Sequence, residues 1–530
     1  MKASWYALPP DAATARGHTV NVLLLSMPDS FEHMAPVAIR MPNGALTSLA
    51  GNVDPHHRVA VADLVLVQDR VAATVERLVQ ECEPDVVGLS VMTFQRRTAL
   101  KLIALVRALR PAARIVIGGY DPSLAPDAWT GPDPGVDFIV RGEGETTFSE
   151  LLRALESGEG HERIGGLSWR GADGGFHHNP DRPVQRLADG SLRLPNRGAR
   201  VLGGYTLLGR AVDVIETSRG CTFDCSFCSI IEMRGRNFHT YDFSRVLDDI
   251  RDARDHGAQA LFIVDDNVTL DVKRFEALCA AIVEAGLNRI DYTVQAMTSA
   301  IADHGETLAP RMREAGFRYV FLGIENVLDE DLGFLKAAAK NIQHQGGRRV
   351  GNATTAAIDH LHRNGMYVVG GLIVGNPSDT PESIEANLRF ARRYVDWPYI
   401  QHPTPYPRTP MTKDLAARGL ITNDRLEEYD GTTAVVKSEH LGAEEIEFLR
   451  WQAERWMKLR HFPVALRHSP GFCLRHGPAM VAHTFRGASW KYWLGLESDR
   501  DVFRRYRQIR KAEREYVEYE PPARPAATTA

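Results

Sequence analysis

The sequence predicts an α/β protein of several domains, because two series of alternating strands and helices follow one another along its 530 residues. Short runs rich in Val, Ile and Leu are typical of buried parallel strands, and the amphipathic stretches between them are typical of crossover helices. The chain is too long for one core. We expect an N-terminal doubly wound, Rossmann-like sheet, then a partial (β/α)6 barrel, then a mostly helical region.

The first series occupies residues 1–160. Its strands are predicted at Val20–Leu25, Val59–Val67, Val86–Leu89, Ile115–Ile117 and Asp137–Val140. Ligands of such sheets lie beyond the carboxyl ends of the strands. The loops at these ends contain the candidate binding residues Ser90, Thr93, Gly118, Gly119, Tyr120, Gly142 and Glu143. Plain turns stay an alternative for the glycines, because glycine is the default residue wherever φ is positive.

The second series occupies residues 206–410, after a Gly-, Pro- and Asp-rich linker at 161–205. Its strands are predicted at Ala211–Ile215, Ala260–Val264, Asp291–Gln295, Tyr319–Ile324, Tyr367–Val374 and Tyr399–His402. Six such units in a row predict an incomplete barrel, whose active groups would lie at the carboxyl ends of the strands.

Residues 411–520 show helical periodicity, most clearly from Ala443 to Arg460, and the Pro/Ala/Thr-rich tail at 521–530 is predicted to be disordered. Four tryptophans of this region stand among helical patterns, and aromatic residues at helical spacing favour a core over a binding surface. They are Trp451, Trp456, Trp490 and Trp493.

Three cysteines, Cys221, Cys225 and Cys228, follow the first barrel strand with the spacing C-x3-C-x2-C. Three thiolates can hold three irons of a 4Fe-4S cluster and leave the fourth iron open to an outside molecule. A structural zinc site is the alternative, but it needs four protein ligands and no second pair lies nearby in the sequence. The other cysteines, including Cys279, are scattered, which indicates a reducing compartment.

Composition excludes some functions. The formal net charge of −4 and the pI near 6.6 give no broad basic field, so nucleic acid is not an expected partner. The first twenty residues lack a signal-peptide pattern. The longest apolar run, near Val368–Val374, is too short to span a bilayer. These observations predict a cytoplasmic enzyme without a membrane span.

The cysteine loop, with the aromatic Phe227 directly before its third cysteine, resembles that of radical S-adenosylmethionine enzymes. In that family the open iron is chelated by S-adenosylmethionine, and one electron from the cluster cleaves the molecule to a 5′-deoxyadenosyl radical. The resemblance implies that Cys221, Cys225 and Cys228 ligate the cluster and that Phe227 packs near the adenine. It also implies an electron donor of the flavodoxin or ferredoxin type.

The same resemblance assigns other strand ends. Asp265 and Asp266 would hold the ammonium of S-adenosylmethionine, although a plain helix N-cap is the alternative. Glu325 would contact the ribose, since a carboxylate offers paired acceptors for two hydroxyls. Gly371 and Gly375 belong to a run that would pass along the adenine and sulfonium, where missing side chains allow close approach.

Residues 84–90, 117–122 and 136–145, in this order before the cysteine loop, resemble the cobalamin-binding domain that precedes many radical S-adenosylmethionine domains. The resemblance implies that the candidate residues of the N-terminal loops hold cobalamin. Members that ligate cobalt with histidine use Asp-x-His-x-x-Gly after the first strand. Here Phe31 stands at the ligand position, His33 follows it, and His56 precedes the second strand, so we expect no histidine on the cobalt.

The proline-rich residues 403–410 resemble a segment of the anaerobic magnesium-protoporphyrin ester cyclase-like branch, in which glycine often stands at the position of Arg408. The resemblance therefore implies a cobalamin-dependent radical enzyme that functionalises an unactivated carbon of a small-molecule substrate. Methyl transfer is preferred. Radical cyclisation or ring rearrangement, and an enzyme whose N-terminal domain is only structural, stay open. A non-enzymatic iron-sulfur or zinc regulator is a remote alternative.

Overall fold

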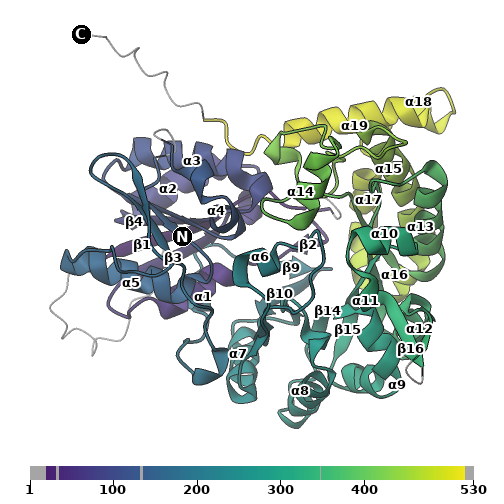
Figure 1. Cartoon of the computed structure of the whole chain (residues 1–530), viewed down its shortest axis with the longest axis horizontal. Helices are drawn as coiled ribbons and strands as arrows, with labels where there is room; N and C mark the ends of the chain where they lie inside the picture. The colour runs from purple at the N-terminus through teal and green to yellow at the C-terminus, as the bar shows by residue number, and fades with distance from the viewer. Residues whose placement is uncertain (1–18, 32–34, 132–134, 346–347, 520–530) are drawn as a thin grey trace.

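The computed structural model describes residues 19–31, 35–131, 135–345 and 348–519, and shows three parts (Figure 1). The N-terminal domain lies on the left, the barrel in the lower centre, and the C-terminal helices along the right side and over the top. The predicted tail at 521–530 and His33 lie outside the described residues.

The N-terminal sheet has seven strands in the order β3-β1-β4-β5-β6-β7-β8. Its parallel strands are β1 (Asn21–Ser26), β3 (Arg58–Asp63), β4 (Val86–Ser90), β5 (Arg114–Gly118) and β6 (Phe138–Val140). Its helices are α1 (Gly44–Asn52), α2 (Val71–Cys82), α3 (Arg96–Leu109), α4 (Tyr120–Leu124) and α5 (Gly144–Ser157). Alternation along β1 sends Leu23 toward α2 and α3 and Leu24 toward α1 and α5, so both faces are buried.

The segment predicted as a surface linker is more ordered than expected. Strands β7 (Leu167–Arg170) and β8 (Phe176–His178) add an antiparallel hairpin to the edge of the N-terminal sheet. Farther on, Arg197 is buried and donates to Asp213 at 3.0 Å and to Asp249 at 2.7 Å. The irregular sequence of this segment therefore reflects short strands and a side chain anchored to the barrel through Asp213 and Asp249, neither of which has a periodic pattern.

The barrel prediction is confirmed. Six parallel strands run in chain order across one sheet: β10 (Arg210–Ile215), β13 (Ala260–Ile263), β14 (Asp291–Met297), β15 (Phe317–Glu325), β18 (Tyr367–Ile373) and β19 (Trp397–Gln401). Helices α7 (Phe243–Asp255), α8 (Val272–Glu284), α9 (Thr298–Glu314), α12 (Thr354–Arg363) and α13 (Pro381–Tyr394) connect them. Two short antiparallel strands, β9 (Thr206–Leu207) and β2 (Ile39–Arg40), complete the β10 edge, so a segment of the N-terminal domain joins the barrel sheet.

The C-terminal region is helical, with α14 (Pro410–Ala417), α15 (Ala443–Arg460), α16 (Phe462–His468), α17 (Pro470–Thr484), α18 (Trp490–Trp493) and α19 (Asp499–Glu513). After α19 the chain returns to the N-terminal domain, where Lys101 pairs with Glu515 at 2.7 Å. Within the described residues, none of the helices combines the length and apolar character needed to cross a membrane.

The prediction for the tryptophans holds only in part. Trp451 is 4% exposed and packs against Phe503 of α19. Trp456, Trp490 and Trp493 are 46%, 65% and 58% exposed, so the prediction of a core position was wrong for them. For Trp490 and Trp493 the physical reason is that α18 is a single short turn at the outer end of α19, where it has little surface to pack against (Figure 1), whereas Trp456 lies on a face of α15 that stays exposed.

Candidate active site

A cavity of about 870 Å³ lies where the three parts of the chain meet. Its lining comes from the loops at the carboxyl ends of the N-terminal strands, from the inward faces of the barrel strands, and from α16 and α17. Several predicted site residues line it: Ser90, Phe227, Cys228, Asp266, Glu325 and Gly371. Ser90 of the N-terminal sheet and the predicted barrel residues therefore face one common space.

The cysteine loop lies between β11 (Ser218–Arg219) and α6 (Ile230–Arg234). Cys221 and Cys225 are buried, and Asn267 donates to the Cys221 Sγ at 3.7 Å. Gly220, just before the loop, has φ +93°, and a Cβ there would lie 2.4 Å from a backbone oxygen, so only glycine fits this turn. Farther along, Ser226 donates to backbone oxygens of the segment at 334–335, which fixes the loop against the barrel.

The two aspartates after β13 take different positions. Asp265 is 2% exposed and accepts hydrogen bonds from the Thr217 N–H and the Ser218 hydroxyl, both at 2.6 Å. It therefore braces the chain that enters the cysteine loop. Asp266 faces the cavity and accepts from the Gly220 N–H at 2.7 Å. The predicted contact with an ammonium stays a prediction, and geometry favours Asp266 for it.

Glu325 ends β15 in the left-handed conformation, with φ +60°, which a non-glycine residue adopts at a cost of order 1 kcal/mol or more. Pairing between β15 and β18 shifts register at this residue. The distortion turns its carboxylate toward the cavity, where it lies 3.4 Å from the Lys340 Nζ. Lys340, on α11 (Ala338–Asn341), was not predicted as a site residue because its helix is too short to show a pattern.

The two predicted glycines of the fifth barrel strand also differ. Gly371 lines the cavity, and an added Cβ would lie 2.7 Å from the Phe321 ring. Gly375 has φ +94°, and a Cβ there would lie 2.5 Å from Ile446 of α15. The close approach of α15 is therefore enough to explain why residue 375 is glycine. The predicted contact of Gly375 with the cofactor stays a prediction.

A second cavity, of about 390 Å³, lies beyond the carboxyl ends of β4, β5 and β6. Most of the predicted N-terminal residues line it: Ser90, Gly118, Gly119, Tyr120, Gly142 and Glu143. Thr93 is buried and lines neither cavity. The opposite wall comes from α1, including Gly44, Ala45 and Ser48, which sequence reasoning missed because α1 has only a weak apolar stripe.

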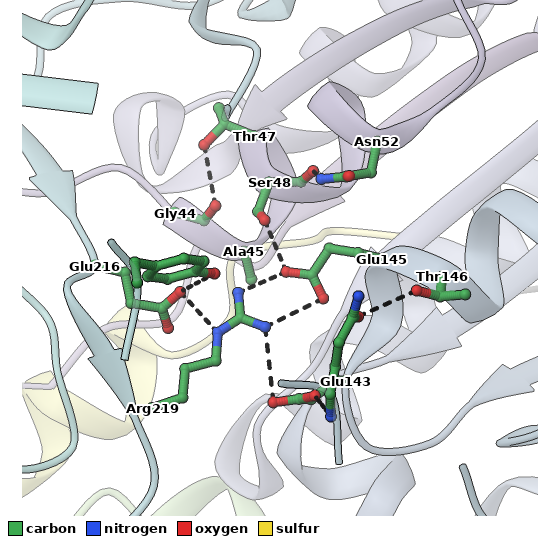
Figure 2. A network of polar contacts seen from close by, with 12 residues as sticks. Gly44, Ala45, Thr47, Ser48, Asn52, Glu143, Glu145, Thr146, Glu216 and Arg219 are labelled. Carbon is green, nitrogen blue, oxygen red and sulfur yellow. Dashed lines mark hydrogen bonds and ion pairs between the residues drawn. The ribbon is translucent and has the colours of Figure 1, made fainter. Parts of the chain in front are cut away.

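A buried ion-pair network joins this cavity to the cysteine loop (Figure 2). Arg219, two residues before Cys221, donates to Glu145 at 2.6 Å and to Glu216 at 2.7 Å, and its Nη1 lies 3.7 Å from Glu143. Burial raises the pKa of Glu145, but Arg219 and a hydrogen bond from Ser48 outweigh burial and hold this pKa at about 2. The network thus clamps the N-terminal domain to the barrel at the start of the cysteine loop.

Comparison with known proteins identifies both halves of this arrangement. The B12 binding domain family matches residues 34–152, and the radical SAM superfamily matches residues 215–391. The chain belongs to the cobalamin-dependent radical S-adenosylmethionine enzymes. It therefore works with a 4Fe-4S cluster, S-adenosylmethionine and cobalamin.

Relatives of this enzyme differ in the reaction that their names give. An uncharacterised methyltransferase of Pyrococcus horikoshii is 28% identical over 429 residues, which cover 81% of this chain and 90% of the relative. The anaerobic magnesium-protoporphyrin IX monomethyl ester cyclase of Rubrivivax gelatinosus is 24% identical, over 69% of this chain but only 64% of the cyclase. The solved cobalamin-dependent radical enzyme OxsB, with aqua-cobalamin and S-adenosylmethionine bound, has the same fold, with a TM-score of 0.64, 15% identity and coverage of 95% of this chain and 77% of OxsB.

The three thiols suit a cluster better than one zinc ion. Zinc with Zn–S bonds of about 2.3 Å would hold its sulfurs within about 4 Å of one another. The three cysteine sulfurs do not lie this close: among the described residues, only His56, His57 and Glu156 bring three potential metal ligand atoms within 4.8 Å of one another. Burial raises the pKa of Cys228 to about 12, so a cluster would have to displace its proton on binding.

The N-terminal residues fit cobalamin as well. Asp29, in the loop after β1, lines the large cavity, and its buried Oδ2 has no hydrogen-bond partner within the described chain. Burial raises the pKa of Asp29 to about 7. At Gly142, with φ +73°, no atom lies within 4 Å of an added Cβ, so open space faces this backbone. Unsatisfied polar atoms and bare backbone are what a bound polar cofactor would cover.

The structure also places the second candidate histidine. His56 precedes β3 and therefore lies at the amino edge of the parallel sheet, opposite the two cavities. It contacts Glu156 at 3.1 Å. Met92, Phe94 and Gln95, from the segment after β4, line the large cavity instead. The expected lack of a histidine on the cobalt stays a prediction.

Proposed function

We propose that this enzyme transfers a methyl group to an unactivated carbon of a large, mainly apolar small molecule. The observation that carries the proposal is the single cavity that extends from Cys228 and Glu325 in the barrel to Met27 and Met92 of the cobalamin domain. When bound, the cluster and S-adenosylmethionine would supply a radical that takes a hydrogen atom from a C–H bond, and cobalamin would supply a methyl group that it receives from a second S-adenosylmethionine. Both would reach one substrate in this space.

The chain's own residues would bind and orient these groups. Glu325 accepts hydrogen bonds from a ribose diol, and its distorted backbone aims the carboxylate into the cavity. Asp266 lies beside the start of the cysteine loop and pairs with Arg234 at 3.3 Å; an ammonium bound there would share its carboxylate with that arginine. The apolar walls exclude water, which protects a reactive radical from side reactions.

The walls farther down the barrel support an apolar substrate. Alternation along the strands turns aromatic side chains of β15, β18 and β19 into the cavity: Tyr319, Phe321, Tyr367, Trp397 and Tyr399. Phe462 of α16 and Phe472 of α17 line the end of the cavity at the C-terminal helices, and Lys458 lines it there as well. Aromatic walls with few charges suit a ring system or hydrocarbon, with space for at most a small anionic group near Lys458.

Radical cyclisation is the second candidate, because the Rubrivivax gelatinosus relative is a cyclase. The experiment that separates the two uses the reconstituted full-length chain and S-adenosylmethionine with a deuterated methyl group, incubated anaerobically with pools of apolar metabolites. Methylation predicts a product that carries the labelled methyl group, with none from the Cys225→Ala protein. A product that has lost two hydrogens without gaining label would support cyclisation and contradict the proposal.

We further propose that the reaction takes place in the cytoplasm with a flavodoxin- or ferredoxin-type electron donor. All six cysteines are free, which suits a reducing compartment. A cluster ligated by cysteine thiolates also needs a reducing compartment. Reduction of the loaded enzyme by a purified donor of either type, followed as formation of 5′-deoxyadenosine, tests this. Dependence on a quinol instead would contradict it.

A further inference from the structure

The C-terminal helices carry an unusual concentration of exposed apolar side chains. Ten large hydrophobic residues are exposed among the described residues, and nine of them lie within 456–496. We call these nine the apolar face: Trp456, Leu459, Phe462, Leu474, Val481, Trp490, Trp493, Leu494 and Leu496. Large apolar side chains that are exposed together on a protein surface mark an interaction site.

Ring contacts through the buried Phe485 connect two members of the apolar face, Trp493 and Trp456. The ring of Trp493 lies 5.1 Å from that of Phe485, which lies 5.6 Å from that of Trp456. These contacts join α18, the end of α17 and α15. In Figure 1, α18 projects at the outer edge of the molecule, far from the N-terminal domain.

The same segment is strongly basic. Residues 455–496 contain seven Lys and Arg residues and no Asp or Glu, although the whole chain has a formal net charge of −4. Of these, Arg460, Arg467, Arg475 and Lys491 are exposed. Exposed Trp and Leu together with basic residues are the combination that binds the interface of anionic membranes.

The mouth of the large cavity opens on this face. Leu459, Phe462 and Val481 line the cavity and are also 36%, 38% and 40% exposed. Leu459 lies one turn from Trp456 on α15, and Val481 lies one turn from Phe485 on α17. These three residues therefore belong both to the lining of the cavity and to the apolar face.

We propose that the apolar face docks on an anionic lipid bilayer, with Trp490 and Trp493 at the level of the headgroups. A second copy of the chain is a poorer occupant, because a twofold interface would bring this basic segment against itself. Docking does not depend on the proposed reaction. It does place the cavity mouth against the membrane, so that an apolar substrate can enter from the lipid without crossing water.

The test is sedimentation of the reconstituted full-length enzyme with vesicles of phosphatidylcholine alone or mixed with phosphatidylglycerol. We expect binding to the anionic vesicles that weakens as salt is raised. Trp490→Ser/Trp493→Ser should weaken binding about tenfold or more. Arg475→Gln/Lys491→Gln should weaken it about 25-fold, since each basic residue near such a surface contributes about a factor of five.

Leu100→Ser is the matched control, because Leu100 is the exposed large hydrophobic residue on the N-terminal domain, and this variant should bind like the parent. Lack of binding to either vesicle, or equal binding by the tryptophan variant, would overturn the proposal. A dimer in sedimentation velocity that dissociates in the Trp490→Ser/Trp493→Ser protein would also overturn it, because a second copy would then cover the face.

Discussion

Replacing Arg219 with leucine tests whether the buried network of Figure 2 holds the two cofactor domains together. Glu145 is 6% exposed, and its pKa is lowered from 4.5 to about 2, which corresponds to about 3 kcal/mol of stabilisation. Removing the partner of a buried charge costs about 3–5 kcal/mol. We therefore expect Arg219→Leu to lower the free energy of local opening at β11 and α5 by about 3–5 kcal/mol at pH 7.

Because unfolding of a chain with several domains is not two-state, the assay is native-state hydrogen exchange of amides in these two elements. The lowered pKa of Glu145 means that its contribution is fully present above pH 4.5 and is lost as the pH falls toward 2. The gap between parent and variant should therefore narrow in that window.

A double-mutant cycle supplies the control. Glu145→Gln/Arg219→Leu removes both charges of the closest ion pair and should restore part of the lost protection, because the buried Glu145 carboxylate is no longer left without its partner, whereas Glu143 and Glu216 still lose theirs. Arg236→Leu, at an exposed pair with Asp224, should cost less than about 1 kcal/mol. Equal hydrogen exchange in the Arg219→Leu protein and the double variant would show that the loss of protection does not come from an unpaired Glu145 carboxylate.

Three further predictions concern the cofactors. Cys225→Ala should lose the cluster and all cleavage of S-adenosylmethionine, whereas Cys279→Ala should keep its iron; equal iron in the Cys225→Ala protein and the parent would contradict the assignment. Glu325→Ala should bind S-adenosylmethionine about ten- to a hundred-fold more weakly by calorimetry, with the cluster intact, because a charged hydrogen bond contributes about 1.5–3 kcal/mol; unchanged affinity would show that Glu325 serves another role. The cobalt(II) form should show no nitrogen splitting in its electron paramagnetic resonance spectrum, and a threefold splitting that vanishes in His33→Ala or His56→Ala protein would place a histidine on the metal.

The parts of the fold that repeat a local pattern were predictable. All six barrel strands lie within a few residues of their predicted positions, because buried strands of a parallel sheet favour short segments rich in apolar residues. The cysteine loop was predictable because its ligands are adjacent in sequence. Residues 39–40 were not, since β2 is two residues long and pairs with β9 far along the chain.

The site was less predictable wherever a partner is distant. Arg219 and Glu145 are 74 residues apart, and neither has a local signal for pairing. Asp265 and Asp266 are adjacent residues of the same type, so the sequence does not distinguish them. In the structure Asp265 is buried and braces the chain, whereas Asp266 lines the cavity. The exposed tryptophans escaped prediction for a related reason: helical spacing says which residues share a face, but not whether another element covers that face.

Metal analysis of the anaerobically reconstituted full-length protein shows whether one chain holds both metal cofactors. We predict about four iron atoms and about one cobalt atom per chain, with Cys225→Ala losing the iron and keeping the cobalt. Full iron with no retained cobalt would contradict the presence of both cofactors in one chain, because the N-terminal domain would then be only structural.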